Sequence, residues 1–349
     1  MDQRFDFVRR QTSRIVVGMD TAARLPTLLR ELGTRRLVVV HDDVLEEAAA
    51  AVATATGASH RLALPGGEAQ KSLAVTGKLV AWLRSIHADR DTTLLAFGGG
   101  TITDLCGFVA AIYLRGVPFV ACPTTTLALC DAALGGKNGV DFDGRKNELG
   151  TIRQPDLIAA DVAWLRTLPP EVFREGFVEV AKMAAVLDAE RFVELEALAP
   201  ALAGRDDAAT LRAIDMAVAM KMAVVAADEH EADRRRWLNF GHTIGHALES
   251  AAGGAWRHGA CVAIGMLAEC RAAGGRVPTT VVQRLAALLH RLGAPTAFPP
   301  EHADPARLWA LTQLDKKARD GEVPMIVPTA LGTGALVPLT RAGLALALA

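Results

Sequence analysis

Three of the nine histidines lie within one short segment, and their spacing suits the binding of an ion. His242 and His246 are four residues apart and would share one face of a helix, and His258 follows closely. Zinc peptidases space two histidines in the same way, but they place a catalytic Glu directly after the first, where this chain has Thr243. The segment therefore predicts a metal or anion site and excludes a peptidase. A helix that carries two histidines without any ligand is the alternative.

Lysine is scarce in this chain, since only eight of the 38 basic residues are Lys. Because Arg has taken most positions that need only a positive charge, the remaining lysines are candidates for sites that need a compact, rotatable ammonium group. Three of them lie in glycine-rich or acid-flanked segments, namely Lys137, Lys146 and Lys182. Lys78 lies at a polar helical position, and we assign it no role in a site.

The composition limits the class of protein. With 349 residues, 51% of them hydrophobic, the chain can bury a large core and is expected to form two domains. A net charge of −1 gives no electrostatic footprint for nucleic acid or an anionic membrane. No apolar run reaches the roughly 18 residues of a membrane helix, and the N-terminus does not resemble a signal peptide. Five cysteines without pairing or metal spacing indicate buried thiols, so we expect a cytoplasmic protein.

The first half of the chain alternates short β-branched runs with amphipathic segments, which predicts a parallel α/β sheet. The expected strands are residues 36–41, 92–97, 117–122 and 157–161, and the expected helices are residues 22–32, 44–56, 72–88 and 104–113.

Long Ala- and Leu-rich stretches dominate the second half. The expected helices are residues 171–196, 207–229, 236–251, 257–274, 279–292 and 305–314. We therefore predict an α/β domain of residues 1–168 and an all-α domain of residues 169–349, divided at Pro169-Pro170. A ligand cleft is expected at this junction.

A glycine-rich turn, residues 97–104, joins one expected strand to the next helix. Its three glycines would let the backbone approach a ligand closely, and the start of the helix would offer N–H groups to a pyrophosphate. The turn lacks the Gly-x-Gly-x-x-Gly pattern, so a plain tight turn is an equal alternative.

Taken together, these segments resemble the sugar phosphate cyclase family and, within it, the 3-dehydroquinate synthases. The resemblance runs nearly end to end, through residues 67–72, 98–104, 113–116, 123–126, 131–137, 146–147, 179–182, 221, 235–246, 258–259 and 315–317. It implies an N-terminal α/β domain that binds NAD, a C-terminal helical domain that carries one divalent metal ion (zinc or cobalt), and a homodimer.

The resemblance also implies a role for individual residues. The metal ligands would be Glu179, His242 and His258, a usual zinc set that leaves room for substrate oxygens. The substrate phosphate would meet Lys137, Asn147, Asn239, His246, Lys316 or Lys317, and Arg115 of the neighbouring subunit. Lys221 and Arg235 would hold a substrate carboxylate, and Lys182 and Asp131 would contact hydroxyl groups. NAD would lie against Asp43, Glu68, Lys71, Gly99, Gly100, Asp104, Thr124, Thr125, Lys146 and Thr167.

The implied reaction converts 3-deoxy-D-arabino-heptulosonate 7-phosphate into 3-dehydroquinate and phosphate, a lyase step in aromatic amino-acid biosynthesis by the shikimate pathway. NAD would oxidise the substrate and then reduce the intermediate, so it would act as a bound catalyst. The metal ion would stabilise an alkoxide, and the cationic pocket would stabilise the leaving phosphate.

Three departures from the family pattern keep other activities open. His41 stands where the family commonly has the Asp that meets the adenosine ribose, so Asp42 or Asp43 would have to substitute, while Asn138 and Met183 differ beside the site. The alternatives are a sibling cyclase that acts on sedoheptulose 7-phosphate, a metal-dependent alcohol dehydrogenase, and a non-catalytic binding protein. Lys221 and Arg235 favour the carboxylated substrate, because buried cations without an anion are costly.

Overall fold

The structure is a computed structural model that describes residues 11–313 and 323–348. Its contacts divide the chain into two compact units. The first unit contains the residues up to 123 together with residues 136–161, and the second contains residues 124–135 together with residues from 162 onward. The chain thus enters the second unit briefly, returns to the first, and leaves it after Asp161. The sequence predicted a single junction at Pro169-Pro170, and Pro170 is instead the first residue of a helix.

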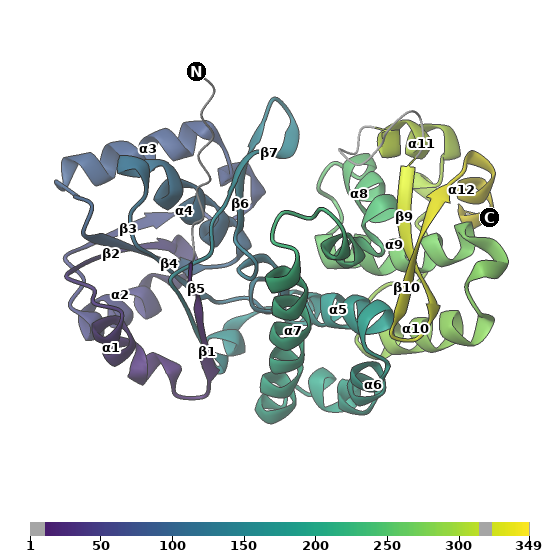
Figure 1. The fold of residues 1–349 in the computed structure, drawn as a ribbon, viewed down its shortest axis with the longest axis horizontal. Helices are drawn as coiled ribbons and strands as arrows, with labels where there is room; N and C mark the ends of the chain where they lie inside the picture. Colours follow the sequence, from purple (N-terminus) through teal and green to yellow (C-terminus); the bar gives the residue numbers. More distant parts are fainter. Residues whose placement is uncertain (1–10, 314–322, 349) are drawn as a thin grey trace, which may run out of the picture. The chain divides into compact units, whose positions relative to one another are not determined.

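The first unit contains a six-stranded parallel sheet in the order β1-β8-β5-β4-β2-β3 (Figure 1). Its strands are β1 (Arg14–Gly18), β2 (Arg36–Asp42), β3 (His60–Leu64), β4 (Thr92–Gly98), β5 (Phe119–Pro123) and β8 (Leu157–Asp161). Every residue of β4, β5 and β8 is buried, as expected for strands covered on both faces. The edge strands β1 and β3 are partly exposed and were not predicted.

Helices flank this sheet, with α1 and α2 on one side and α3 and α4 on the other (Figure 1). The elements are α1 (Thr21–Glu31), η1 (Asp43–Leu45), α2 (Glu46–Thr56), η2 (Glu68–Gln70), α3 (Leu73–Ser85), α4 (Gly100–Ile112) and η3 (Tyr113–Arg115). An antiparallel ribbon of β6 (Lys137–Phe142) and β7 (Arg145–Ile152) completes the unit. The predicted strand–glycine turn–helix order is confirmed, because β4 ends at Gly98 and α4 begins at Gly100.

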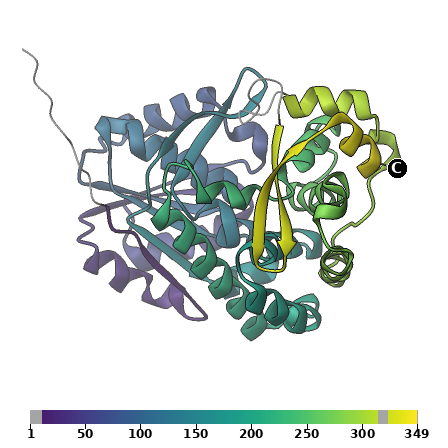
Figure 2. The same cartoon turned by 45° about the vertical axis from the view of Figure 1, so that its right-hand side comes forward.

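The second unit is mainly helical. Its long helices are α5 (Pro170–Leu187), α6 (Ala189–Ala203), α7 (Asp207–Ala227), α8 (His242–Ala251), α9 (His258–Ala272), α10 (Thr279–Arg291), α11 (Pro305–Gln313) and α12 (Arg341–Leu348). Its short turns are η4 (Ala128–Ala132), η5 (Val162–Thr167), η6 (Arg234–Asn239), η7 (Gly274–Arg276) and η8 (Pro300–His302). An antiparallel hairpin of β9 (Val323–Ala330) and β10 (Thr333–Leu339), yellow in Figure 2, makes the unit helical but not all-α.

Two predicted helices are interrupted. The stretch 171–196 breaks at Asp188, whose backbone is extended and whose carboxylate caps α6 by accepting from the Arg191 N–H at 3.0 Å. The stretch 236–251 breaks at Gly241, where φ is +80°. A residue with a side chain rarely adopts that conformation, so α8 begins only at His242.

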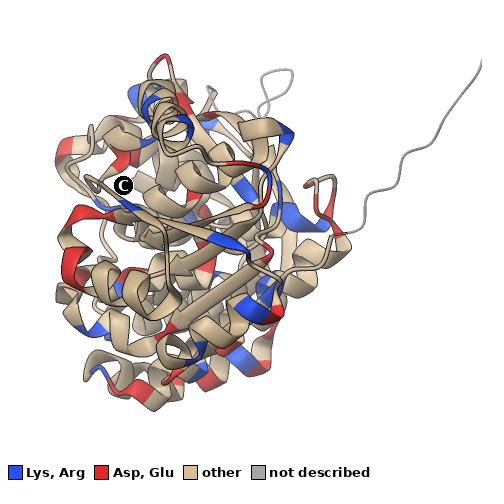
Figure 3. Cartoon of the chain, turned by 90° about the vertical axis from the view of Figure 1, so that its left-hand side faces the viewer, with Lys and Arg blue, Asp and Glu red and all other residues tan. Residues whose placement is uncertain are grey.

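The described part of the chain has no helix that is both long and apolar enough to cross a membrane. Along the ribbon of the described residues, basic and acidic positions are interspersed (Figure 3). This distribution agrees with the near-zero net charge of the chain.

Candidate active site

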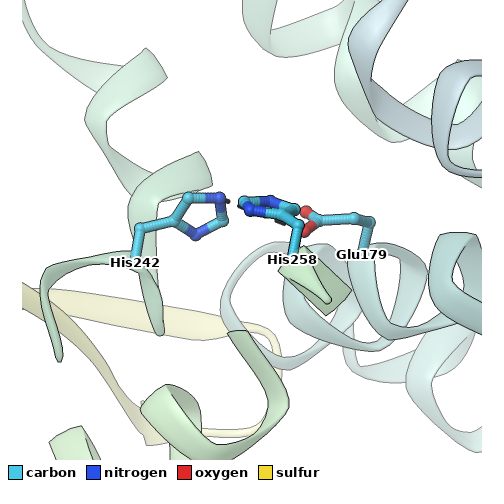
Figure 4. A group of neighbouring side chains, drawn as sticks. All are labelled: Glu179, His242 and His258. Atoms are coloured by element: carbon cyan, nitrogen blue, oxygen red, sulfur yellow. Dashed lines mark ion pairs between the residues drawn. The ribbon is translucent and has the colours of Figure 1, made fainter. Parts of the chain in front are cut away.

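Three side chains that could hold a metal ion, called the metal-binding group below, converge within the second unit (Figure 4). Glu179 lies in the middle of α5, whereas His242 and His258 are the first residues of α8 and α9. The Glu179 Oε1 atom lies 3.6 Å from His258 Nε2 and 4.0 Å from His242 Nε2. Ligands about 2.1 Å from a tetrahedral zinc ion lie about 3.4 Å apart, so a small inward movement would close this set around an ion. The structure brings the three predicted ligands together.

The electrostatics of this group favour a cation. Glu179 is fully buried, forms an ion pair with Lys182 and faces both histidines. Burial alone would raise the pKa of Glu179, but Lys182 and His258 hold it at about 2. Burial likewise opposes the charged form of His258, yet Glu179 and Glu249 raise the pKa of His258 to about 10. The buried Glu179 carboxylate favours protonation of His258. A divalent ion that binds the carboxylate and the imidazole would replace that proton.

Further charged side chains of the second unit lie close to one another, namely Lys182, Lys221 and Asp131. Lys182, one turn along α5, forms an ion pair with Glu179 and is 1% exposed. Lys221 on α7 donates to the Asp131 carboxylate at 2.7 Å. Burial opposes the charged form of both lysines. At Lys182, Glu179 and Asp131 outweigh this effect and raise the pKa. At Lys221, burial is the larger effect and lowers the pKa, although Asp131 opposes it. Asp131 belongs to η4, a π-helical turn of the kind often found at functional sites.

Arg235 is the buried member of three consecutive arginines. It is 2% exposed, while Arg234 and Arg236 are exposed, so a solvated charge run is ruled out for this residue. Its guanidinium donates to the carbonyl oxygens of Glu229 and Gly135, the latter at 2.8 Å. Burial lowers the pKa of Arg235, with nearby acidic groups opposing that effect.

One part of the predicted geometry is wrong. The sequence predicted Asn239 and His242 on one helix of residues 236–251, but Asn239 lies on η6 with Arg235, and His242 begins α8 after the turn at Gly241. Asn239 donates to the Glu231 carboxylate at 2.6 Å. His246 does share a helix face with His242, since their ring centroids are 5.0 Å apart, and it lies 5.9 Å from the His258 ring. The structure therefore gathers all three histidines.

The predicted NAD residues of the first unit cluster around the start of α4. Lys71, which is 5% exposed, donates to Asp104 at 2.8 Å and to Asn147 at 2.6 Å. Glu68 lies 3.7 Å from Lys71 and 3.9 Å from Lys146. Gly99 occupies the N-cap position of α4 without a side-chain cap, so the first turn of α4 presents backbone N–H groups, as a dinucleotide site requires.

At the end of β2, Asp42 and Asp43 differ in their surroundings. The Asp42 carboxylate accepts from the Val44 N–H at 3.3 Å and lies against Gly66, where a Cβ atom would come within 2.6 Å of it. Burial raises the pKa of Asp42, although its hydrogen bond to Val44 opposes this. Asp43 begins η1 and is exposed.

The remaining predicted residues are dispersed. In the first unit, Lys137 begins β6 and is exposed, and Arg115 lies in η3 with φ of +66°. In the second unit, Thr125 accepts from the Ala128 N–H at 3.1 Å, Thr124 is buried beside it, and Thr167 is exposed at the end of η5. Lys316 and Lys317 lie outside the described residues.

The sequence interpretation missed four glutamates near the metal-binding group. Glu249 lies 3.4 Å from His258 Nδ1, and Glu231 accepts from Asn239. Glu175 lies against Gly259, and burial raises its pKa to about 7. Glu269 accepts from the backbone at the start of α8. Only Glu249 had a signal in the sequence, because it falls three residues after His246 on the same helix.

Two family profiles cover most of the chain. The profile described as 3-dehydroquinate synthase N-terminal matches residues 61–175, and the one described as 3-dehydroquinate synthase C-terminal matches residues 176–318. The 3-dehydroquinate synthase of Symbiobacterium thermophilum is 40% identical over 336 residues, which is 93% of each chain. The 3-dehydroquinate synthase of Lactiplantibacillus plantarum is 40% identical over 84% of this chain and 81% of its own.

Solved structures of cyclases share the fold. The 2-epi-5-epi-valiolone synthase ValA of Streptomyces hygroscopicus subsp. jinggangensis, with NAD+ and Zn2+ bound, matches with a TM-score of 0.90 and 28% identity over 99% of this chain and 98% of its own. A 2-deoxy-scyllo-inosose synthase complexed with carbaglucose-6-phosphate, NAD+ and Co2+ matches with a TM-score of 0.87 and 25% identity over 96% and 95%. With both profiles matched and relatives at 40% identity along nearly the whole length, the chain belongs to the 3-dehydroquinate synthase family.

Proposed function

We propose that this protein is a 3-dehydroquinate synthase, a lyase that converts 3-deoxy-D-arabino-heptulosonate 7-phosphate into 3-dehydroquinate and phosphate. The observation that carries the proposal is the convergence of Glu179, His242 and His258, in a chain whose relatives of that name are about 40% identical. The buried Lys182, Lys221 and Arg235 in the same unit supply the cations that an acidic, phosphorylated substrate requires.

The proposed cofactors are NAD and one divalent ion, zinc or cobalt, as in the cyclase structures that carry them. Glu179, His242 and His258 would hold the ion, and Lys71, Asp104 and the Gly99–Gly100 turn would contribute to the dinucleotide site. When bound, NAD would supply reversible oxidation of a substrate hydroxyl and the ion would supply Lewis-acid stabilisation of the resulting charge.

The residues of the chain itself account for recognition of a carboxylate. The carboxylate of Asp131 already neutralises Lys221, whereas the guanidinium of Arg235 makes its hydrogen bonds to uncharged carbonyl oxygens. Acidic groups lie near Arg235, but its guanidinium hydrogen bonds go to carbonyl oxygens, so a substrate carboxylate would add a charge-assisted bond to it. Arg235 would therefore select the carboxylated heptulosonate.

Cationic and polar side chains would also stabilise the leaving phosphate. The His246 ring lies 5.9 Å from the His258 ring, and Asn239 donates to Glu231; both would donate to phosphate oxygens as charge develops there. The proposal includes Lys137 and Asn147 in this role, a homodimer in which Arg115 reaches the neighbouring site, and a cytoplasmic location.

A second candidate is a sibling cyclase that uses sedoheptulose 7-phosphate. The likeness to the valiolone synthase structure, with a TM-score of 0.90, favours it, but that sugar has no carboxylate for Arg235. The test is to supply the purified protein with NAD and zinc or cobalt, offer each heptulose phosphate separately, and measure phosphate release and NADH absorbance. Release from the heptulosonate without accumulation of NADH supports the proposal. Faster release from sedoheptulose 7-phosphate would refute it, and steady NADH accumulation would indicate a dehydrogenase.

A further inference from the structure

The helix that carries His242 begins without a cap from its own sequence. The N-cap position of α8 is Gly241, which has no side chain to accept a hydrogen bond from the first turn. The first four N–H groups of a helix have no partner within the helix, and leaving them unpaired in a buried region is costly. Gly241, His242, Thr243 and Ile244 are all buried. An acceptor must therefore come from elsewhere in the chain.

Glu269 supplies that acceptor from α9. Its Oε2 atom accepts from the Gly241 N–H at 2.7 Å, and its Oε1 atom accepts from the Ile244 N–H at 3.0 Å. In a capping box, the N-cap residue and the third residue of the helix each satisfy the N–H group of the other. Here one carboxylate from a different helix satisfies both of those N–H groups.

The position of Glu269 would be unfavourable for a carboxylate without these hydrogen bonds. The side chain is fully buried, and a buried carboxylate is costly unless it is paired or hydrogen-bonded. It also lies in the last turn of α9, where the helix dipole disfavours a negative charge. The two charge-assisted hydrogen bonds offset these costs and place the carboxylate at the positive end of α8.

Glycine contacts hold the same two helices in close register. A Cβ atom at Gly265 would lie 2.1 Å from the Gly241 carbonyl oxygen, and one at Gly245 would lie 2.9 Å from the Cys261 carbonyl oxygen. The backbones of α8 and α9 therefore touch, and Glu269 lies one turn beyond Gly265. Small shifts of α8 along α9 are opposed by the glycine contacts and by the carboxylate together.

The restrained backbone carries a proposed metal ligand. His242 lies between the two N–H groups that Glu269 accepts, and its Nδ1 atom is 3.2 Å from the Phe240 carbonyl oxygen. Donation from Nδ1 to that carbonyl would leave Nε2, the atom nearest Glu179, as the metal-binding nitrogen.

We propose that Glu269 is a positioning residue: its carboxylate caps α8 and thereby preorganises His242 for the divalent ion. The inference rests on the proposed function only for the statement that Glu179, His242 and His258 bind a metal ion. It assigns Glu269 no contact with substrate, cofactor or metal.

The test compares Glu269→Gln with Asp188→Asn by measuring zinc affinity. Glutamine keeps the shape of the side chain but can accept only through its single oxygen, so one of the two N–H groups loses its acceptor. Asp188 caps α6 in the same unit and forms no part of the metal-binding group, which makes it the matched control. We expect Glu269→Gln to weaken zinc binding to the metal-free protein at least ~10-fold, the loss typical when a supporting contact of a ligand is removed. Asp188→Asn should change zinc affinity less than twofold.

Two further measurements separate positioning from simple stabilisation. The visible absorption spectrum of bound cobalt should change in Glu269→Gln and not in Asp188→Asn, because ligand geometry differs. In the unmodified protein, zinc should slow hydrogen exchange at the Gly241 and Ile244 amides, a result available even if the variants fail to fold. A folded Glu269→Gln protein with unchanged zinc affinity, or no effect of zinc on those amides, would overturn the proposal. A protein that binds zinc through His258 but converts neither heptulose phosphate would refute the proposed function and leave the role of Glu269 standing.

Discussion

The two candidate binding regions handle charge differently. In the second unit, Glu179, Lys182, Lys221 and Arg235 are all at most 6% exposed and lie on three separate elements, α5, α7 and η6. In the first unit, only Lys71 is buried among the charged residues of the dinucleotide region, and the start of α4 contributes backbone N–H groups. Removing one member of the buried group leaves a charge without compensation, whereas the dinucleotide region shares its contacts among many groups. Single substitutions should therefore cause a severe loss of activity in the second unit and a smaller loss of NAD binding in the first.

The largest expected effect is that of His258→Ala. Removing one of three ligands leaves Glu179 and His242 as an incomplete set, so stoichiometric zinc and turnover should both disappear. Metal content by elemental analysis and phosphate release are the measurements. His290→Ala, on the exposed surface of α10, is the control and should retain both. Full metal content in the His258 variant would show that the ligand set is misassigned.

Arg235→Ala should come next. We expect kcat/KM for the heptulosonate to fall at least ~100-fold, about 2.7 kcal/mol, because a charged partner of the carboxylate is lost. Arg234→Ala is a matched control. The Arg234 side chain is exposed, so this substitution should change kcat/KM little. Similar small effects from both variants would contradict the role of Arg235, provided that thermal unfolding shows both proteins to be folded.

Lys71→Met probes the first unit, where a smaller loss is expected. The variant keeps the length of the side chain but removes the donor to Asp104 and Asn147, so the dissociation constant for NAD should rise ~10-fold while the zinc content stays unchanged. Lys78→Met, at an exposed position of α3, should leave NAD binding as it is. A loss of all activity and of bound zinc would mean that the two regions are not independent in the way the comparison requires.

The smallest effect concerns Glu175, one turn before Glu179 on the same helix. Burial raises the pKa of Glu175 from 4.5 to about 7, the opposite direction to Glu179. The folded protein thus binds this proton more tightly than the unfolded chain, so its contribution to stability is full below pH 4.5 and is lost as the pH rises through about 7.

Glu175→Gln removes this titration. In the metal-free protein, the variant should unfold about 2 °C above the unmodified protein near ~pH 8, and the difference should shrink near ~pH 5. Glu171→Gln, exposed one turn earlier on α5, should show no such pH dependence. A constant difference at every pH would rule out the titration of Glu175 as its cause.

The sequence predicted the elements whose patterns reflect burial. Strands β4, β5 and β8 are continuous apolar runs because both of their faces are covered, and they were predicted nearly in full. Edge strand β1 has only exposed and intermediate positions and β3 has one buried residue, so their patterns resemble loops. The break at Gly241 was missed because helical periodicity continues across a single glycine. The left-handed backbone and the closeness of Met266, which a Cβ atom at this position would meet, are visible only in the fold.

The candidate site was predictable only in part. The spacing of His242 and His246 fixes their shared helix face, and the structure confirms this. No local pattern connects Glu179 to His242 and His258, which follow it by about 60 and about 80 positions; only the family resemblance implied that association. Glu269 gave no signal at all, because a buried carboxylate that caps another helix looks in the sequence like any acidic residue near a helix end.

The brief passage of residues 124–135 through the second unit has a consequence for dividing the protein. That segment provides the carboxylate of Asp131 for Lys221, the carbonyl of Gly135 for Arg235, and the hydroxyl of Thr126, which accepts from the Gly176 N–H at 3.2 Å. A polypeptide cut at the Pro169-Pro170 pair would leave all three behind. The residues after Pro169 therefore do not form a self-sufficient domain. If they were expressed alone or exchanged between proteins, Lys221 and Arg235 would remain buried without the groups that they contact. Any working division must carry residues 124–135 along with the helices they serve.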